Sequence, residues 1–256
     1  MVPVVEIFSS LQGEGERAGV PSIFVRTGLC NFRCEGFGCT IVAPDGETVT
    51  GCDSIRAVSP KFKDRWKQFI DYEDFVKEIE SYFPQYDKHN IIKPDIVFTG
   101  GEPLLFWKDD VYQRTLSYFL SRHHKVTIET NASLDIDFFR EYQKKIQFSM
   151  SVKLSNSGEP EHKRINIDTI TKMLEYGNNS YLKFVVSKDS WDNDFKEIKG
   201  ILKRIPIFAP VYLMPLGETQ THLEKNAKFV FEKCIELGFC YSDRLHIRCF
   251  NDKEAV

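Results

Sequence analysis

Residues 95–130 read DIVFTGGEPLLFWKDDVYQRTLSYFLSRHHKVTIET, and this stretch decides the fold. It begins with an apolar, β-prone run at 95–99 and passes through Gly-Gly-Glu-Pro into an amphipathic segment at 109–122, before a second β-prone run at 125–130. Short apolar runs of this kind predict buried strands, whereas apolar residues at helical spacing predict a helix. The stretch therefore predicts two strands of one sheet that are joined by a helix on its outside.

The same alternation of strand and helix extends over most of the chain. Further strands are predicted at residues 21–26, 147–153, 181–186, 211–214 and 245–249. Further helices are predicted at residues 72–83, 136–145, 167–176, 194–205 and 222–237. This pattern is typical of the α/β class, in which a parallel sheet or barrel has helices outside and carries its chemistry at the C-terminal ends of the strands.

The length of 256 residues suits one large α/β domain, and neither an internal repeat nor a linker divides the chain. We therefore expect a single domain over residues 1–256. Residues 41–67 interrupt the alternation, because they carry the turn signal Pro44-Asp45-Gly46 and show no clean helical period until later. This segment is interpreted as an insertion.

Composition and charge exclude several classes of protein. The chain is 42% hydrophobic and 28% charged, as in ordinary globular proteins, and its net charge of −3 gives no reason to expect nucleic acid as a partner. No apolar run is long enough for a membrane span, and the opening Met1-Val2-Pro3-Val4-Val5-Glu6 lacks the features of a secretory signal. We expect a cytoplasmic protein with no membrane partner.

The seven cysteines need an explanation, since an odd number in a chain without an export signal favours reduced thiols over disulfides. The four that fall within 23 residues are Cys30, Cys34, Cys39 and Cys52. The three that are scattered near the C-terminus are Cys234, Cys240 and Cys249. The scattered group is interpreted as small hydrophobic residues, and the cluster of four indicates a metal site.

Two kinds of metal site are compatible with the clustered cysteines. A [4Fe–4S] cluster on three thiolates keeps one iron open, and that iron can chelate the amino and carboxylate groups of a small molecule. A structural zinc site would use all four cysteines and would be closed. Zinc ligands are usually separated by two to four residues, whereas Cys39 and Cys52 are separated by twelve. The spacing favours the iron–sulfur cluster.

Two motifs make a resemblance specific. Cys30-Asn31-Phe32-Arg33-Cys34, followed by another cysteine, resembles the signature of radical S-adenosylmethionine enzymes, and Thr99-Gly100-Gly101-Glu102-Pro103 is similar to the cofactor-binding GGEP loop of that superfamily. With Leu11-Gln12-Gly13-Glu14-Gly15, Glu129-Thr130-Asn131 and Leu245-His246, they resemble the 7-carboxy-7-deazaguanine synthase family over nearly the whole chain. The resemblance implies a modified, partial (β/α) barrel with mostly parallel strands and outer helices.

The third cluster ligand is either Cys52 or Cys39. In the superfamily, the third cysteine follows the second after two residues and precedes Asp-Thr. Cys39 lies nearer to Cys34 but precedes Thr40-Ile41, whereas Cys52 precedes Asp53-Ser54. We favour Cys52, because the turn-rich segment before it can loop out and return it to the cluster. Ser54 then replaces the threonine that binds Mg²⁺ in relatives, and its hydroxyl keeps the oxygen ligand that this ion requires.

The resemblance also implies two further groups of site residues. The residues implied in cofactor binding are Phe37, Gly100, Gly101, Glu102, Glu129, Ser151 and Lys153, with Val152 in place of the family's proline. The residues implied in substrate binding are Gln12, Glu14, Arg26, Thr99 and His246. Without the resemblance, Gln12 and Glu14 would be interpreted as a solvated turn, Arg26 as a surface residue, and His246 as a structural histidine on the last predicted strand. Arg26 suits a bidentate contact with the substrate's carboxylate.

The function implied is the conversion of 6-carboxy-5,6,7,8-tetrahydropterin to 7-carboxy-7-deazaguanine with release of ammonia, in 7-deazapurine (queuosine-type) biosynthesis. The implied cofactors are a [4Fe–4S] cluster, S-adenosylmethionine and Mg²⁺. The implied partners are the pterin, an electron donor such as flavodoxin or ferredoxin, and a second copy of the chain in a homodimer. Two alternatives stay open: an activase that makes a glycyl radical on a protein, and a non-catalytic zinc-binding module.

Overall fold

Nine strands form one sheet in the computed structural model, which describes residues 1–84, 92–251 and 253. Their order across the sheet is β11-β10-β9-β8-β7-β6-β2-β1-β5. The strands are β1 (Val2–Leu11), β2 (Pro21–Thr27), β5 (Lys67–Phe69), β6 (Asp95–Gly100), β7 (Val126–Thr130), β8 (Gln147–Ser151), β9 (Tyr181–Val186), β10 (Val211–Pro215) and β11 (Cys240–Tyr241). From β2 to β11 each pair of neighbours is parallel, whereas β1 runs antiparallel to both β2 and β5. The predicted α/β class with mostly parallel strands is therefore confirmed.

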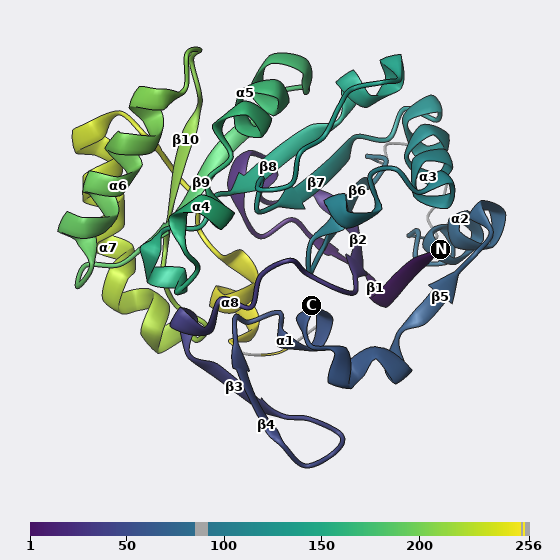
Figure 1. Cartoon of the computed structure of the whole chain (residues 1–256), viewed down its shortest axis with the longest axis horizontal. Helices are drawn as coiled ribbons and strands as arrows, with labels where there is room; N and C mark the ends of the chain where they lie inside the picture. Colours follow the sequence, from purple (N-terminus) through teal and green to yellow (C-terminus); the bar gives the residue numbers. More distant parts are fainter. Residues whose placement is uncertain (85–91, 252, 254–256) are drawn as a thin grey trace.

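Helices cover the outer side of this curved sheet, where α3, α5, α6 and α7 lie in Figure 1. The α-helices are α1 (Ile55–Val58), α2 (Tyr72–Glu80), α3 (Asp110–Ser121), α4 (Glu161–Arg164), α5 (Ile167–Tyr176), α6 (Trp191–Arg204), α7 (Gln220–Leu237) and α8 (Leu245–Phe250). Short 3-10 turns are η1 (Gly15–Arg17), η2 (Glu35–Phe37), η3 (Pro60–Arg65), η4 (Pro103–Phe106), η5 (Glu141–Lys145) and η6 (Ser155–Ser157). None of the helices in the described part of the chain has the length and apolarity to cross a bilayer.

Aromatic side chains fix the strands against the outer helices. Phe98 on β6 packs edge-on against Tyr112 of α3, with ring centroids 5.1 Å apart. Phe148 on β8 packs against Trp107, with ring centroids 6.0 Å apart, and all four side chains are buried. Burial of large aromatic groups is a major source of folding free energy, so the ends of β6 and β8 are held in one place.

Residues 39–51 form a separate two-stranded hairpin of β3 (Cys39–Val42) and β4 (Thr48–Gly51). Gly46 in its turn has a φ of +85°, a conformation that glycine adopts at little cost. A small hydrophobic core joins the hairpin to the segment that follows it, and its buried residues are Ala43, Ile55, Phe62 and Trp66. The interpretation of residues 41–67 as an insertion stays a prediction, as does the single domain.

Two segments differ from the sequence prediction. Residues 245–249, predicted as a strand, belong to the helix α8, in which only Ile247 is buried. Five residues are too few for the apolar pattern to distinguish a strand from a helix. Within residues 136–145, predicted as a helix, only the 3-10 turn η5 forms. The antiparallel strand β1 is not predicted by the sequence pattern.

Candidate active site

The C-terminal ends of β6 and β7 bring three of the predicted site residues together. Thr99 at the end of β6 donates from Oγ1 to Oε2 of Glu129 on β7 at 2.7 Å. Gln12, which directly follows β1, donates from Nε2 to the other carboxylate oxygen of Glu129 at 3.2 Å. Glu129 is thus oriented by two neighbours at the edge where α/β folds carry their chemistry.

The glycine loop packs directly on the backbone that leads to the first cysteine. Gly101 N donates to Thr27 O at 3.0 Å, and Glu102 N donates to Leu29 O at 2.8 Å. A Cβ atom added to Gly101 would lie only 1.8 Å from Leu29 O. The close approach therefore requires glycine at this position.

The side chain of Glu102 is fully buried, and its hydrogen bonds hold neighbouring parts of the candidate site in place. Its Oε1 accepts hydrogen bonds from Leu104 N at 3.0 Å and from Thr130 Oγ1 at 2.7 Å, and its Oε2 accepts one from Asn131 N at 2.7 Å. Burial raises the pKa of this carboxyl despite these bonds. Asn131 in turn donates to Oδ1 of Asn31 at 2.9 Å. The end of β7 is thus tied to the cysteine loop.

The thiols of Cys30, Cys34 and Cys52 lie near one another. Burial raises the pKa of Cys30 and of Cys34 to about 12 each, and burial also raises the pKa of Cys52. Charge on Cys34 or Cys52 would raise the pKa of Cys30 further, and charge on Cys52 would do the same to Cys34. The three sulfur atoms therefore influence one another electrostatically.

The thiol of Cys39 forms a hydrogen bond with a residue outside this group, Glu218. Its Sγ donates to Oε2 of Glu218 at 2.8 Å, and burial together with this carboxylate raises its pKa to about 12. In the hairpin, Cys39 pairs with Gly51, which ends β4. Cys52 directly follows Gly51 and therefore lies near Cys39. The assignment of Cys52 as the third cluster ligand stays a prediction.

Backbone contacts hold the cysteine loop in place. Oε1 of Glu159 accepts hydrogen bonds from Arg33 N at 2.8 Å and Cys34 N at 3.0 Å. In the part of the chain that the structure describes, no three His, Cys, Asp or Glu side chains stand in a ready-made metal-binding arrangement. The chemistry of the donors still fits an iron–sulfur cluster, because cysteine thiolates are the usual ligands of such clusters and the thiol protons would leave on binding.

Three of the residues implied in cofactor binding meet beside Cys34. Lys153 donates from Nζ to Oγ of Ser151 at 2.9 Å, and the same nitrogen lies 5.8 Å from the ring centroid of Phe37. The positive charge of Lys153 opposes the effect of burial on the pKa of Cys34. A cation is thus placed next to thiols that must lose protons to bind iron.

Glu14, a candidate substrate-binding residue, lies in a largely buried group of charged side chains. It pairs with Lys183 of β9, and its Oε1 accepts a hydrogen bond from Nε of Arg244 at 3.1 Å. Nη2 of Arg244 also donates to Oδ2 of Asp53 at 2.9 Å. Burial alone would raise the pKa of Glu14, but Lys183, Arg244 and His246 hold it well below its ordinary value. Glu14 is therefore ionised at neutral pH.

Arg26 and Ser54 lie within reach of each other. Nε of Arg26 donates to Oε1 of Glu6 at 2.7 Å, and its Nη1 lies 3.4 Å from Oγ of Ser54. Ser54 also donates to Oδ1 of Asp53 at 3.3 Å. The residue predicted to bind the substrate's carboxylate is thus next to the residue predicted to bind Mg²⁺.

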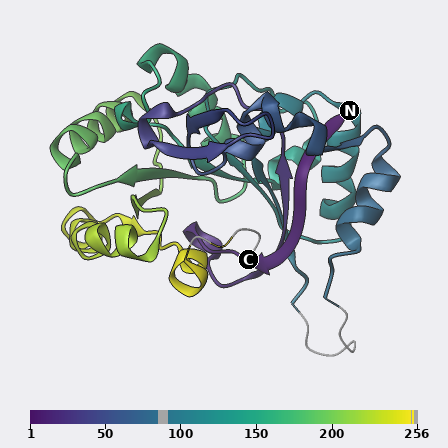
Figure 2. The same cartoon turned by 90° about the horizontal axis from the view of Figure 1, so that it is seen from below.

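His246 reaches the same group from α8 and not from a strand as predicted. A Cβ atom added to Gly13 would lie 2.3 Å from its Nδ1, so the imidazole packs on the backbone between Gln12 and Glu14. Leu245 N donates to Gly13 O at 3.0 Å. Figure 2 shows α8 beside the segment that follows β1. Burial lowers the pKa of His246, so its ring is neutral at neutral pH.

Comparison with known proteins shows which family the chain belongs to. The chain is 30% identical to the 7-carboxy-7-deazaguanine synthase of Halobacterium salinarum, over 98% of this chain and 91% of that relative. It belongs to the 7-carboxy-7-deazaguanine synthase family. The synthase of Rhodopirellula baltica is 28% identical, over 99% of this chain and 88% of its own length. No family model matches the chain.

A solved structure supports the fold of this synthase family member. QueE from Escherichia coli superimposes with a TM-score of 0.63 and 20% identity, covering 94% of this chain and 93% of that one. Agreement over nearly both chains identifies the sheet with outer helices as a shared architecture. The relatives named as synthases establish that the chain is an enzyme of this family, and they favour it over the activase and the zinc-binding module.

The sequence did not predict three charged residues of the candidate site, namely Asp53 as a partner of Arg244, Arg244 itself, and Lys183. One signal existed for Lys183, because it is a charged residue in the middle of the apolar run Tyr181–Val186. A lysine buried on a strand needs an anionic partner. For Arg244 no such signal exists, since its partner Glu14 is 230 positions away.

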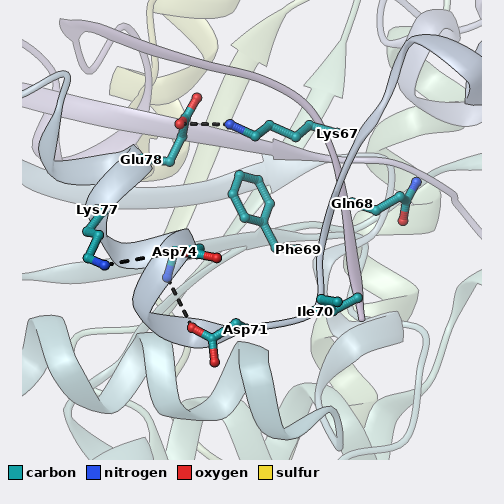
Figure 3. Close-up of a pocket in the computed structure, with 8 residues that line it drawn as sticks. All are labelled: Lys67, Gln68, Phe69, Ile70, Asp71, Asp74, Lys77 and Glu78. Atoms are coloured by element: carbon teal, nitrogen blue, oxygen red, sulfur yellow. Dashed lines mark hydrogen bonds and ion pairs between the residues drawn. The ribbon is translucent and has the colours of Figure 1, made fainter.

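A hollow lies apart from the candidate site. It has a volume of about 370 Å³ and lies between β5 and α2, as shown in Figure 3. Lysine and acidic side chains line it, and Lys67 and Glu78 form an ion pair across it at 2.8 Å. None of the predicted site residues lines it.

Proposed function

We propose that the chain is a radical S-adenosylmethionine carbon–nitrogen lyase that converts 6-carboxy-5,6,7,8-tetrahydropterin to 7-carboxy-7-deazaguanine and ammonia. The observation that carries this proposal is the contact of the glycine loop with the cysteine loop, in which Glu102 N donates to Leu29 O, one residue before Cys30. This contact places the two motifs of the resembled superfamily side by side. Membership of the synthase family supports the substrate and the role in 7-deazapurine (queuosine-type) biosynthesis.

Cys30, Cys34 and Cys52 would hold the [4Fe–4S] cluster. Their mutual electrostatic influence supports Cys52 as the third ligand. The hydrogen bond from Cys39 to Glu218 argues against the alternative. When bound, the cluster and S-adenosylmethionine supply the radical chemistry that begins the ring contraction.

The residues around the cysteines would bind and orient S-adenosylmethionine. The Gly100-Gly101 segment would offer backbone C=O groups to the amino group of the ligand's methionine part, since Gly101 N already donates to Thr27 O. Glu129 would accept hydrogen bonds from the cofactor with a carboxylate that Thr99 already orients. Lys153 would contribute a cation beside Phe37. Glu102 stays a predicted cofactor residue, and its bonds to the loop support a positioning role.

The substrate would lie between Arg26 and the Glu14 segment. Arg26 offers a planar guanidinium for the pterin carboxylate, and Ser54 offers an oxygen for Mg²⁺ beside it. Glu14, held ionised, would accept hydrogen bonds from the N–H groups of the pterin ring. His246 is neutral, so its ring can donate one hydrogen bond and accept another.

An anaerobic assay tests the proposal. The purified chain is reconstituted with iron and sulfide, then supplied with S-adenosylmethionine, Mg²⁺, a strong reductant and the carboxy-tetrahydropterin. We expect 7-carboxy-7-deazaguanine, identified by mass, and no product from Cys30→Ala. Cluster assembly without product would contradict the assigned reaction, and zinc in place of iron and sulfide would favour the zinc-binding module. The flavodoxin or ferredoxin donor, the homodimer and the cytoplasmic location are further predictions of the resemblance.

A further inference from the structure

Arg244 joins two segments that are far apart in the sequence. It directly precedes α8, and its side chain is only 13% exposed. Its Nε donates to Glu14, and its Nη2 donates to Asp53. Its Nη1 donates to Gly217 O at 2.6 Å. All three guanidinium nitrogens therefore have a protein partner, which fixes the orientation of the side chain.

The charges in this group alternate. Lys183, Glu14, Arg244 and Asp53 follow one another as cation, anion, cation and anion. Without Arg244, the largely buried carboxylate of Glu14 and the exposed carboxylate of Asp53 would face each other without the cation between them, which is unfavourable. The guanidinium of Arg244 thus allows the carboxylates of Glu14 and Asp53 to lie close together.

Asp53 lies between two residues that have proposed roles, Cys52 and Ser54. Ser54 begins the helix α1, and its carbonyl oxygen accepts hydrogen bonds from Ala57 N at 2.9 Å and Val58 N at 3.2 Å. A change in the position of Asp53 would therefore move the third cluster ligand, the candidate Mg²⁺ ligand and the start of α1.

We propose that Arg244 is a positioning residue that holds the loop Cys52-Asp53-Ser54 against the substrate-binding segment at Glu14. Arginine is required because its planar guanidinium donates hydrogen bonds to both carboxylates and to a carbonyl oxygen at once. The single ammonium group of lysine cannot span these three acceptors. The roles of the two joined segments rest on the proposed function. The tether between them does not, since it consists of hydrogen bonds between side chains of this chain.

Hydrogen exchange in the metal-free protein tests the tether directly. In Arg244→Met the amides of Ala57 and Val58 should exchange about tenfold faster than in the unchanged chain, because Ser54 O is no longer held. Asp53→Asn should have a similar effect, and the double variant should exchange no faster than either single variant. Arg244→Lys should restore part of the protection. The control is Arg248→Met on α8, whose Nε pairs with Asp243, two residues before that helix.

Unchanged exchange in Asp53→Asn, or additive effects in the double variant, would overturn the proposal. The result for Asp53→Asn can be read even if Arg244→Met does not fold. A second measurement follows iron loss from the reconstituted protein to a chelator, which should be several-fold faster in Arg244→Met and Asp53→Asn than in Arg248→Met. Equal rates in all three would also refute the tether's effect on the cluster loop. A wild-type chain that binds no cluster would contradict the proposed function and leave the exchange result intact.

Discussion

Gly101 lies where a single added methyl group has no room. Its neighbour Leu29 O belongs to the backbone, so it cannot move aside as a flexible side chain could. The glycine loop and the cysteine loop are therefore one unit, and a change in the first should be detected in the second.

We predict that Gly101→Ala lowers the free energy of unfolding by roughly 1–3 kcal/mol, because overpacking forces the backbone to shift. It should also reduce the iron bound per chain after reconstitution. Urea unfolding and iron analysis check both effects. The control is Gly200→Ala on α6, where an added Cβ meets nothing within 4 Å. Alanine there should stabilise the helix by about 0.5–1 kcal/mol.

The choice between Cys52 and Cys39 is also made at the scale of single residues. Cys52→Ala should abolish cluster assembly, as Cys30→Ala should, because each removes a thiolate that has no substitute. Cys39→Ala should retain the cluster, since it loses only a bond to Glu218. Iron and sulfide per chain are the measurement. The reverse result would make Cys39 the third ligand and remove the basis for Ser54 as a magnesium ligand.

Glu14 gives a prediction for pH. Its folded-state pKa lies far below the ordinary value, so its ionisation stabilises the fold above about pH 5, and this stabilisation is lost as the pH falls. Glu14→Gln should cost roughly 3–5 kcal/mol at pH 7, because Lys183 loses its anionic partner. It should also lose less further stability between pH 5 and pH 3 than the unchanged chain. Urea unfolding at each pH measures the difference.

The matched control for this pH series is Glu232→Gln on α7. Glu232 and Lys228 form an exposed ion pair at 3.9 Å, and such pairs contribute little. Parallel pH profiles of the Glu14 variant and the unchanged chain would show that the ionisation of Glu14 is not coupled to folding.

Among the secondary-structure elements, the hairpin β3–β4 determines where Cys52 lies. Its register pairs Cys39 with Gly51, and its turn depends on the positive φ of Gly46. We predict that Gly46→Val destabilises the chain by about 1–2 kcal/mol, since a β-branched residue adopts this conformation poorly. Gly46→Asn should be tolerated better. Thermal unfolding of both variants checks the order, and equal melting temperatures would contradict it.

The elements that the sequence predicts well are those with a clear period over several residues. The strands β6 to β10 and the helices α2, α3, α5, α6 and α7 are apolar in a regular pattern that burial dictates. The helix α8 is short and has one buried residue, so its pattern carries too little information. The motifs could place Glu129, Thr99 and Gln12 at one site, but no local pattern could pair Lys183 or Arg244 with Glu14.

At the scale of the whole molecule, the candidate site is complete only when α8 lies against the segment that follows β1. Because α8 contributes just one buried residue, a chain that ends at Asp243 should keep its sheet. It should nevertheless lose binding of 6-carboxypterin, a fluorescent analogue of the substrate, since Arg244 and His246 are removed. Circular dichroism and fluorescence titration separate the two effects. Binding of wild-type strength would show that α8 has no part in the site.

The bond between Arg244 and Glu14 spans 230 positions of sequence, and this has a consequence for synthesis on the ribosome. The cysteines and the glycine loop leave the exit tunnel early, whereas Arg244 emerges only after nearly all of the sheet has been translated. During most of translation, the carboxylates of Glu14 and Asp53 therefore lack the cation that joins them. The contact that joins the Cys52 loop to the Glu14 segment can therefore form only near the end of synthesis.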